Sequence, residues 1–120
     1  MSNYATGHEA EKVAADYLAR NGYTVIECNW RHKRAEIDIV AQKKHRFRSD
    51  EPLTFFEVKH RKTDYQGRGL DYITPKKLQQ MRFAAQLYVA IHKTTTQYKL
   101  GAVELAGVDY QVTNVLDDIS

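Results

Sequence analysis

The sequence predicts an α/β fold in which helices cover a mixed β-sheet, in the order helix, three strands, helix, and one or two further strands. Two observations predict it. Apolar residues recur at helical spacing near the N-terminus and again after residue 74, and the segments between them are rich in β-branched and aromatic residues. Strands with short links pair antiparallel, whereas the passage of roughly thirty residues through the second helix permits a parallel crossover.

Length and composition are typical of one small domain. The 120 residues are enough for one hydrophobic core and contain no repeat, so we expect a single domain over residues 1–120. Cys28 is the one cysteine and cannot form an internal disulfide. The N-terminal residues lack the apolar run of a secretory signal, and no segment is long and apolar enough to span a membrane. These observations predict a cytoplasmic protein without membrane contacts.

The first predicted helix covers residues 7–21. Thr6 is placed to cap its start, and the Asn21-Gly22 pair is a typical stop signal. Glu11 lies at the edge of the apolar stripe that ends at Leu18, and therefore beside the face that packs on the sheet.

Three strands are predicted next, at residues 23–30, 35–42 and 53–60. The polar, basic residues 43–51 connect the second strand to the third. The second strand alternates cleanly, and side chains in a strand point to opposite faces in turn. The alternation places Glu36, Asp38 and Val40 on one face and Ile37, Ile39 and Ala41 on the other.

A second helix is predicted to open at Thr74 and Pro75. Threonine is a good cap, and proline fits the first helical turn. An apolar stripe carries this helix to about His92. The polar residues 63–72 before it are predicted to form a loop, and the segments 98–106 and 110–116 after it are strand candidates.

An acidic group on these elements is the strongest functional signal. Glu57 and Lys59 are two residues apart in the third strand, so they project from the same face. Alone they are typical of a surface ion pair. If strand pairing places Asp38 on the face of Glu57, the two carboxylates converge near Glu11. Such carboxylates repel each other and are costly to bury, and Mg²⁺ relieves this cost because it binds carboxylate oxygens. The set therefore fits metal-dependent phosphodiester hydrolysis, with Lys59 beside the attacking water.

Basic residues bracket this acidic group, although the net charge is only +3. The layout fits a polyanion such as DNA held over a small acidic spot, and solvated strand ends and turns are the alternative. Backbone N–H groups at the start of the second helix are a further place to hold a phosphate. The residues expected to contact nucleic acid are Arg31, Lys33, Arg34, Arg61, Lys62, Arg68, Lys76 and Lys77.

Four segments resemble, in order and spacing, the YraN-like family of small bacterial proteins. They are EAEKVAADYLARNGYTVIECNWR, AEIDIVA, FFEVKHRK and ITPKKLQQMRFAAQLYV, and the resemblance covers residues 7–102. That family belongs with the PD-(D/E)XK, or restriction-endonuclease-like, superfamily, which also holds the archaeal Holliday junction resolvases. The resemblance implies a restriction-endonuclease-like fold with an α-β-β-β-α-β core and a mixed central sheet.

The resemblance also implies roles for single residues. Asp38 corresponds to the metal-binding aspartate of the superfamily, and Glu57 and Lys59 correspond to its (D/E)XK pair. Glu11 corresponds to the first-helix glutamate of the resolvase-like members. In those enzymes the aspartate, the glutamate and the carbonyl of the residue at Val58 hold Mg²⁺ or Mn²⁺, and the lysine orients or activates the attacking water.

The chain also departs from the family pattern. Ala10 and Ala35 stand where the family usually has glycine, and Gly101 stands where it often has aspartate. Glu36 matches the glutamate of the family's GEID motif and is assigned a supporting role. His8 lies close to Glu11 in the sequence and is a candidate for proton transfer.

The predicted function is a metal-dependent endonuclease that cuts phosphodiester bonds in DNA, with structured or branched DNA as the substrate that the resolvases imply. Two cuts in such a junction would require a homodimer with two symmetric sites. Two alternatives use the same fold: a nucleic-acid-binding module without turnover, and an interaction adaptor in a DNA-processing system.

Overall fold

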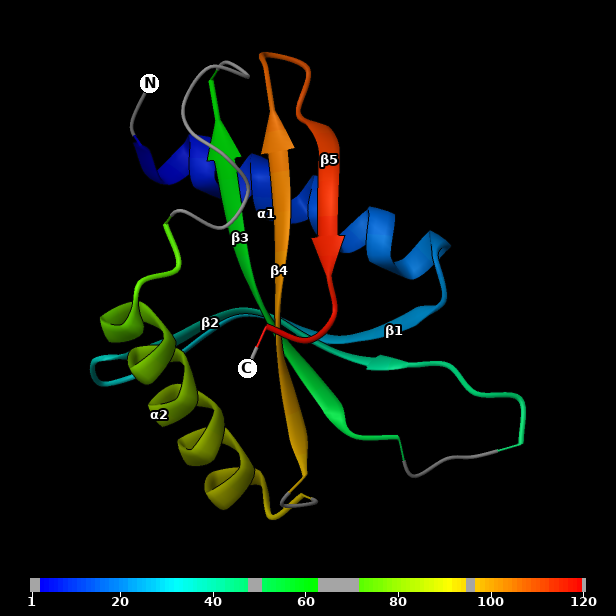
Figure 1. The fold of residues 1–120 in the computed structure, drawn as a ribbon, viewed down its shortest axis with the longest axis vertical. Coiled ribbons are helices and arrows are strands. Elements are labelled where there is room, and N and C mark those ends of the chain that lie inside the picture. The colour runs from blue at the N-terminus through cyan, green and yellow to red at the C-terminus, as the bar shows by residue number, and fades with distance from the viewer. Residues whose placement is uncertain (1–2, 48–50, 63–71, 95–96, 120) are drawn as a thin grey trace.

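The computed structural model describes residues 3–47, 51–62, 72–94 and 97–119, with side chains from residue 8 onward. Its elements are α1 (Asn3–Arg20), β1 (Tyr23–His32), β2 (Ala35–Lys43), β3 (Leu53–Arg61), α2 (Pro75–His92), β4 (Tyr98–Ala106) and β5 (Gln111–Leu116), as Figure 1 shows. The described strands form one sheet in the order β1-β2-β3-β4-β5. β3 and β4 run parallel and the other neighbours are antiparallel. The predicted α-β-β-β-α-β core and mixed sheet are confirmed.

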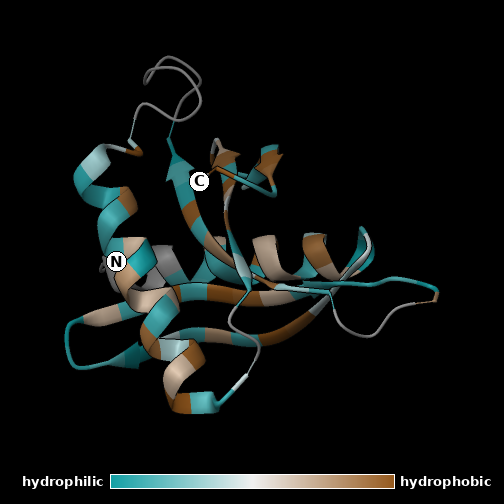
Figure 2. Cartoon of the chain, turned by 60° about the horizontal axis from the view of Figure 1, so that its bottom comes forward, coloured by the Kyte–Doolittle hydropathy of each residue, from teal (hydrophilic) through white to brown (hydrophobic). Residues whose placement is uncertain are grey.

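The two helices cover the sheet through two separate groups of buried side chains. Leu18 of α1 packs with Ile39 and Phe56, whereas Tyr88 of α2 packs with Phe55. Phe55 and Phe56 are neighbours in β3 and join different groups because successive strand residues face opposite sides. In Figure 2 apolar and polar colours accordingly alternate along the strands and along the helices. β3 is therefore central to both halves of the core.

The C-terminal end of α1 agrees with the sequence prediction, whereas its N-terminal end does not. The helix begins at Asn3, so the expected cap at Thr6 is wrong. A helix continues until a residue ends it, and a glycine such as Gly7 costs only about 1 kcal/mol in a helix. At the other end Asn21 donates from Nδ2 to the Tyr17 carbonyl at 2.7 Å, and Gly22 has a φ of 95°. The predicted stop is confirmed.

Both ends of α2 agree with the sequence. Thr74 Oγ1 accepts a hydrogen bond from the Lys77 N–H at 3.1 Å, which satisfies one of the free donors of the first turn. The helix ends at His92, and Lys93 adopts the left-handed conformation that often closes a helix. The start of α2 is thus fixed beside the sheet. Among the described residues, no helix is both long and apolar enough to cross a lipid bilayer.

The strict alternation expected in β2 is wrong. Ile37 and Val40 pack in the α2 group, whereas Ile39 packs in the α1 group, so the pattern breaks between Ile37 and Ile39. At the same level of β1, Asn29 has a left-handed φ of 53°, although the register of β1 on β2 is unchanged on both sides of it. Pairing of β2 with β3 extends only from Gln42 to Ile39. Beyond Ile39 the strands part, and in Figure 1 β1 and β2 cross β3 and β4 near the middle of their length, below the level of α1. Asp38 lies at the point of separation.

Candidate active site

Asp38 takes the place of a missing backbone partner where β2 leaves β3. The last paired residues are Ile39 and Phe56. Val58 comes two residues further along β3, and its N–H donates to Asp38 Oδ2 at 2.8 Å. Buried backbone N–H groups need a partner, so this hydrogen bond fixes the carboxylate in the gap between the strands.

Glu11 of α1 approaches Asp38 from the helix side. The two carboxyl groups share a hydrogen bond. His8 Nδ1 lies 3.8 Å from Glu11 Oε2, one turn earlier on the helix. Burial raises the pKa of Asp38 to about 7, the Val58 N–H opposes this shift, and the nearby charge of Glu11 adds to it. Burial also raises the pKa of Glu11. One proton is therefore readily held between these two groups.

Glu57 has a different neighbour although it stands next to Val58 in β3. Its Oε1 lies 3.0 Å from Lys77 Nζ, in the first turns of α2. Burial, followed by the charge of Asp38, raises the pKa of Glu57, and Lys77 acts in the opposite direction. Burial acts to lower the pKa of Lys77, but the Glu57 carboxylate outweighs it and the pKa rises. Asp38 and Glu57 are thus close enough to repel each other, while each is held by a different helix.

Lys59 follows on the same side of β3 as Glu57. β3 pairs without interruption with β4 through both residues, so their side chains project in the same direction. Lys59 is exposed to solvent, and its Nζ lies 5.8 Å from the centre of the Tyr72 ring. An exposed ammonium group beside a buried carboxylate is placed to contact a substrate that approaches Glu57.

An open groove of about 600 Å³ leads from Glu57 along α2. One wall is the start of β2 and the turn before it, and the other wall is the N-terminal half of α2. The lining residues are Arg34, Ala35, Glu36, Glu57, Lys76, Lys77, Gln79, Gln80, Met81 and Phe83. The groove therefore joins the acidic group to several of the predicted phosphate contacts.

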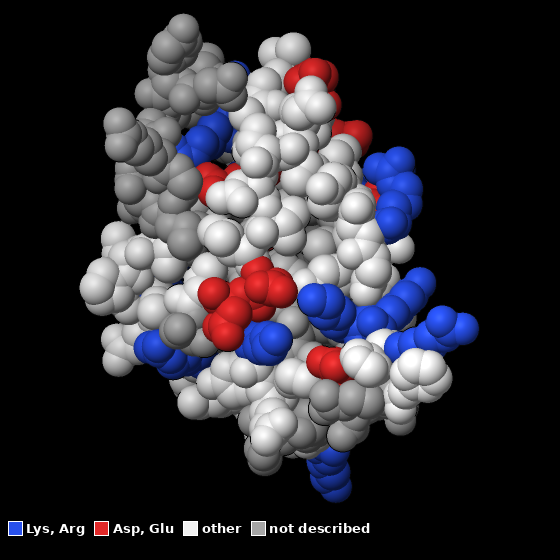
Figure 3. Space-filling model, turned by 45° about the vertical axis from the view of Figure 1, so that its right-hand side comes forward, with Lys and Arg blue, Asp and Glu red and all other residues white. Residues whose placement is uncertain are grey.

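The remaining predicted basic contacts are dispersed. Lys33 and Lys62 are exposed, and Arg31 pairs with Glu36 at 3.6 Å on the surface. Arg68 lies outside the described residues. On the face drawn in Figure 3, several basic side chains lie together on the right-hand side and a group of acidic ones lies near the centre, so this face carries both signs of charge.

Arg61 lies inside the protein and makes an ion pair there. Its side chain is only 12% exposed, and its Nε lies 3.6 Å from Glu104 Oε2 of β4. Arg61 therefore does not belong to the exposed cations expected at a nucleic-acid surface. The sequence reasoning overlooked Glu104, although a glutamate inside the apolar segment YKLGAVELA is itself a signal of a buried partner.

Gly101 explains one departure from the family pattern. A Cβ at this position would lie 2.7 Å from the Phe56 ring and 2.7 Å from the Leu116 carbonyl oxygen. An aspartate there would need a shift of backbone and ring. In this chain the β4 position beside Phe56 is filled by the core, and the acidic group is made by Glu11, Asp38 and Glu57.

The donor set suits a hard divalent cation, but the arrangement is charge-compensated without one. Asp38 and Glu57 offer carboxylate oxygens on either side of Val58, and oxygen ligands are what Mg²⁺ and Mn²⁺ prefer. Within the described part of the chain, no three Asp, Glu, His or Cys side chains gather closely enough to hold one ion. A cation bound by both carboxylates would compete with Lys77 for the charge of Glu57.

Fold and site together define a small α/β protein with an acidic cluster where two central strands part and a groove with basic walls beside it. The chain belongs to the uncharacterised protein family UPF0102, whose sequence model matches residues 10–109. This assignment agrees with the YraN-like resemblance of the sequence.

Individual relatives support the assignment. A UPF0102 protein of Chlorobium phaeobacteroides is 41% identical over 69% of this chain and 61% of its own length. A UPF0102 protein of Hahella chejuensis is 39% identical over 69% of this chain and 62% of its own length. One of Vibrio parahaemolyticus is 30% identical over 88% of this chain and 84% of its own. The match thus spans about three fifths of the length of the first two relatives.

Proposed function

We propose that this chain is a divalent-metal-dependent endonuclease of the restriction-endonuclease-like superfamily that hydrolyses phosphodiester bonds in DNA. The observation that carries the proposal is the meeting of Asp38 and Glu57 where β2 and β3 part, beside an exposed Lys59. Burial raises the pKa of both carboxyl groups, and the charge of Asp38 adds to the shift of Glu57, so two such groups in a partly buried place are unfavourable for stability alone. Strongly shifted acids beside a groove are typical of catalytic sites.

In the proposed reaction the residues of this chain have separate tasks. Asp38 and Glu57 would hold Mg²⁺ or Mn²⁺, which supplies a Lewis acid for the phosphate and lowers the pKa of a bound water. The Val58 N–H keeps the Asp38 carboxylate oriented. Lys59 is placed to orient the attacking water or a phosphate oxygen.

Glu11 supports this arrangement from α1. Because its carboxyl group hydrogen-bonds Asp38, it restricts the rotation of that side chain and can hold a proton beside it. His8, 3.8 Å from Glu11, offers a route for that proton to solvent. Glu36 adds negative charge that raises the pKa of Asp38, so it favours a cation at the site without binding it.

Lys77 has a role that follows from its contact with Glu57. In the structure its ammonium group neutralises Glu57 at 3.0 Å. A bound divalent ion would displace it, and the released ammonium group lies in the groove together with Arg34 and Lys76. There it can contact a substrate phosphate. Lys77 would thus couple substrate binding to the release of Glu57.

Cleavage of DNA tests the proposal. Supercoiled, linear and branched DNA are incubated with the purified chain and Mg²⁺ or Mn²⁺, beside Asp38→Ala and Lys59→Ala proteins from the same preparation. Removal of a metal ligand or of a transition-state contact is expected to lower the rate at least about 100-fold. Cleavage by both variants at the wild-type rate would show that another protein is responsible and would overturn the proposal.

A second candidate is a nucleic-acid-binding module without turnover. The contact that favours it is the Lys77–Glu57 ion pair, because it stabilises Glu57 without any metal. This candidate predicts DNA binding that weakens with salt and persists in EDTA, and no cleavage with either cation. The same incubation therefore separates the two candidates.

A further inference from the structure

Phe83 is an exposed aromatic residue in the middle of α2. It is 59% exposed, although a phenylalanine on a helix that packs against a sheet is usually turned inward. The ring lines the groove that starts at Glu57. Single exposed apolar residues are common on protein surfaces, so exposure alone indicates nothing. The residues that line the groove beside the ring indicate what Phe83 could bind.

The wall of the groove that carries Phe83 is a regular ridge of the helix. Lys76, Gln79, Gln80 and Phe83 all line the groove, and steps of three and four residues place them on one side of α2. A cation thus lies near the Glu57 end, two amide side chains follow, and an aromatic ring stands at the far end. Arg34 contributes a second cation from the opposite wall. This sequence of groups matches the phosphate, the polar edges and the flat face of a nucleotide.

We propose that this groove binds an unpaired segment of nucleic acid, with one base stacked on Phe83. Arg34 and Lys76 contact phosphates, and the amides of Gln79 and Gln80 contact the edge of the base or the sugar. Proteins that bind single strands commonly combine cations along the backbone with aromatic rings under the bases. The bases of an intact duplex are stacked on each other, so only an unpaired base can reach the ring.

The size of the groove agrees with this occupant. About 600 Å³ is within the range of sites for small organic molecules, and a nucleotide is a molecule of that size. The groove also begins at Glu57, so a strand lying in it would bring a phosphate to the acidic group. The inference rests on the proposed function only for the class of ligand. It names an overhang, flap or unpaired junction strand as the part of the substrate that this side of the site holds.

Binding without cleavage tests the inference. Fluorescence anisotropy in EDTA compares a labelled blunt duplex with the same duplex carrying a single-stranded overhang. Loss of one base–aromatic stack is expected to weaken overhang binding by Phe83→Ala roughly 5- to 150-fold, because such a stack contributes about 1–3 kcal/mol. Binding of the blunt duplex should change less than about 2-fold. Phe83→Tyr keeps a ring and should restore the affinity for the overhang.

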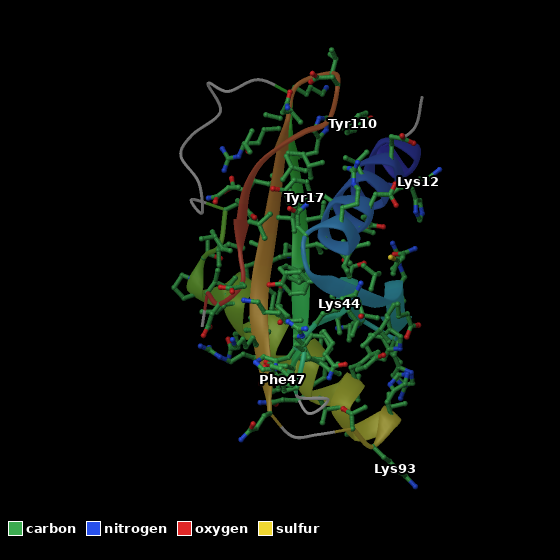
Figure 4. The ribbon with its side chains drawn as sticks, turned by 90° about the vertical axis from the view of Figure 1, so that its right-hand side faces the viewer. Lys12, Tyr17, Lys44, Phe47, Lys93 and Tyr110 are labelled. Carbon is green, nitrogen blue, oxygen red and sulfur yellow. The ribbon has the colours of Figure 1, made fainter. Side chains whose placement is uncertain are left out.

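Phe47 provides a matched control for an exposed ring. It is 85% exposed and follows β2 at the end opposite to Ala35. In Figure 1 the residues that directly follow β2 project to the right, away from α2, and Figure 4 shows Phe47 from that side. Phe47→Ala should leave the binding of both oligonucleotides unchanged. Thermal unfolding of each variant confirms that it is folded, which is expected because both rings are exposed.

Three results would overturn the inference: wild-type affinity of Phe83→Ala for the overhang, equal losses for overhang and duplex, or no binding of either by the wild type. Failure of the proposed function looks different. A wild-type protein that binds the overhang through Phe83 but cleaves nothing with Mg²⁺ or Mn²⁺ supports the inference and contradicts the nuclease proposal. Cleavage by the wild type, together with unchanged overhang binding by Phe83→Ala, would support the nuclease proposal and contradict the inference.

Discussion

Asp38 and Glu57 are two carboxylates in neighbouring strands, yet the protein compensates them in different ways. Asp38 faces α1, where it accepts a hydrogen bond from the Val58 N–H and shares another with Glu11. Glu57 faces α2, where Lys77 lies at 3.0 Å. The first group is a pair of acids that readily keeps a proton, whereas the second is an ion pair. A divalent cation would replace a proton at one carboxylate and an ammonium group at the other.

The largest expected effect of this difference between Asp38 and Glu57 is on the pH dependence of the free energy of unfolding. The pKa of Asp38 is about 7 in the folded protein and about 3.9 in an unfolded chain. The folded state therefore binds more protons between these values, so the free energy of unfolding falls as the pH rises from about 4 to about 7. In EDTA, the wild type should lose roughly 2–4 kcal/mol over this range relative to Asp38→Asn.

Urea denaturation at pH 4, 5.5, 7 and 8 measures this effect. Glu11 and Glu57 titrate in both proteins and both interact with Asp38, so the difference between the two curves reports Asp38 together with its coupling to these two groups. At pH 8 the variant should be the more stable protein. Curves that run parallel across the range would contradict the assignment of a buried, protonated Asp38.

Breaking the Lys77–Glu57 ion pair should change the free energy of unfolding by a smaller amount. Lys77→Gln removes the cation from a partly buried Glu57, and we expect the free energy of unfolding in EDTA at pH 7 to fall by about 1 kcal/mol. Lys76→Gln is the matched control, because Lys76 is an exposed lysine in the same turn. Equal stabilities of the two variants would mean that Lys77 does not neutralise Glu57 in solution.

The smallest effect is expected from Glu36, whose charge acts on both carboxylates. Its side chain is 59% exposed and pairs with Arg31 at 3.6 Å. Glu36→Gln removes a repulsive charge and a weak surface pair together, so stability should change by less than about 0.5 kcal/mol. The pKa of Asp38 should fall slightly, which an NMR titration of the carboxyl carbons can follow. A rise in that pKa would contradict the direction assigned to Glu36.

Local signals in the sequence predicted most of the fold. The cap at Thr74, the stop at Asn21 and Gly22, and the strands on either side of residues 43–51 depend on neighbouring residues and agree with the structure. The length of the crossover through α2 permitted the parallel pairing of β3 with β4 that the structure has, but did not require it. Thr6 was misjudged because a good capping residue does not end a helix that can continue.

The geometry of the site depended on contacts between distant residues and was less predictable. Residues Asp38, Glu57 and Glu11 could be chosen from their spacing in the sequence. The break in the alternation of β2 at Asp38, however, arises where β2 leaves β3, and the sequence of β2 alone gives no sign of it. The contact of Lys77 with Glu57 likewise joins residues from different elements. The sequence predicted Lys77 as a phosphate contact, but it gave no sign that Lys77 forms an ion pair with Glu57.

Calorimetric titration with Mn²⁺ tests the central claim most directly. The claim is that Asp38 and Glu57 bind one divalent cation in competition with a proton and with Lys77. At pH 8, where Asp38 is ionised, the wild type should bind Mn²⁺, and Asp38→Asn and Glu57→Gln should each bind at least about 10-fold more weakly. Lys77→Gln should bind more tightly than the wild type, because Glu57 is then unpaired. Equal binding heats and affinities for the wild type, Asp38→Asn and Glu57→Gln would contradict the account.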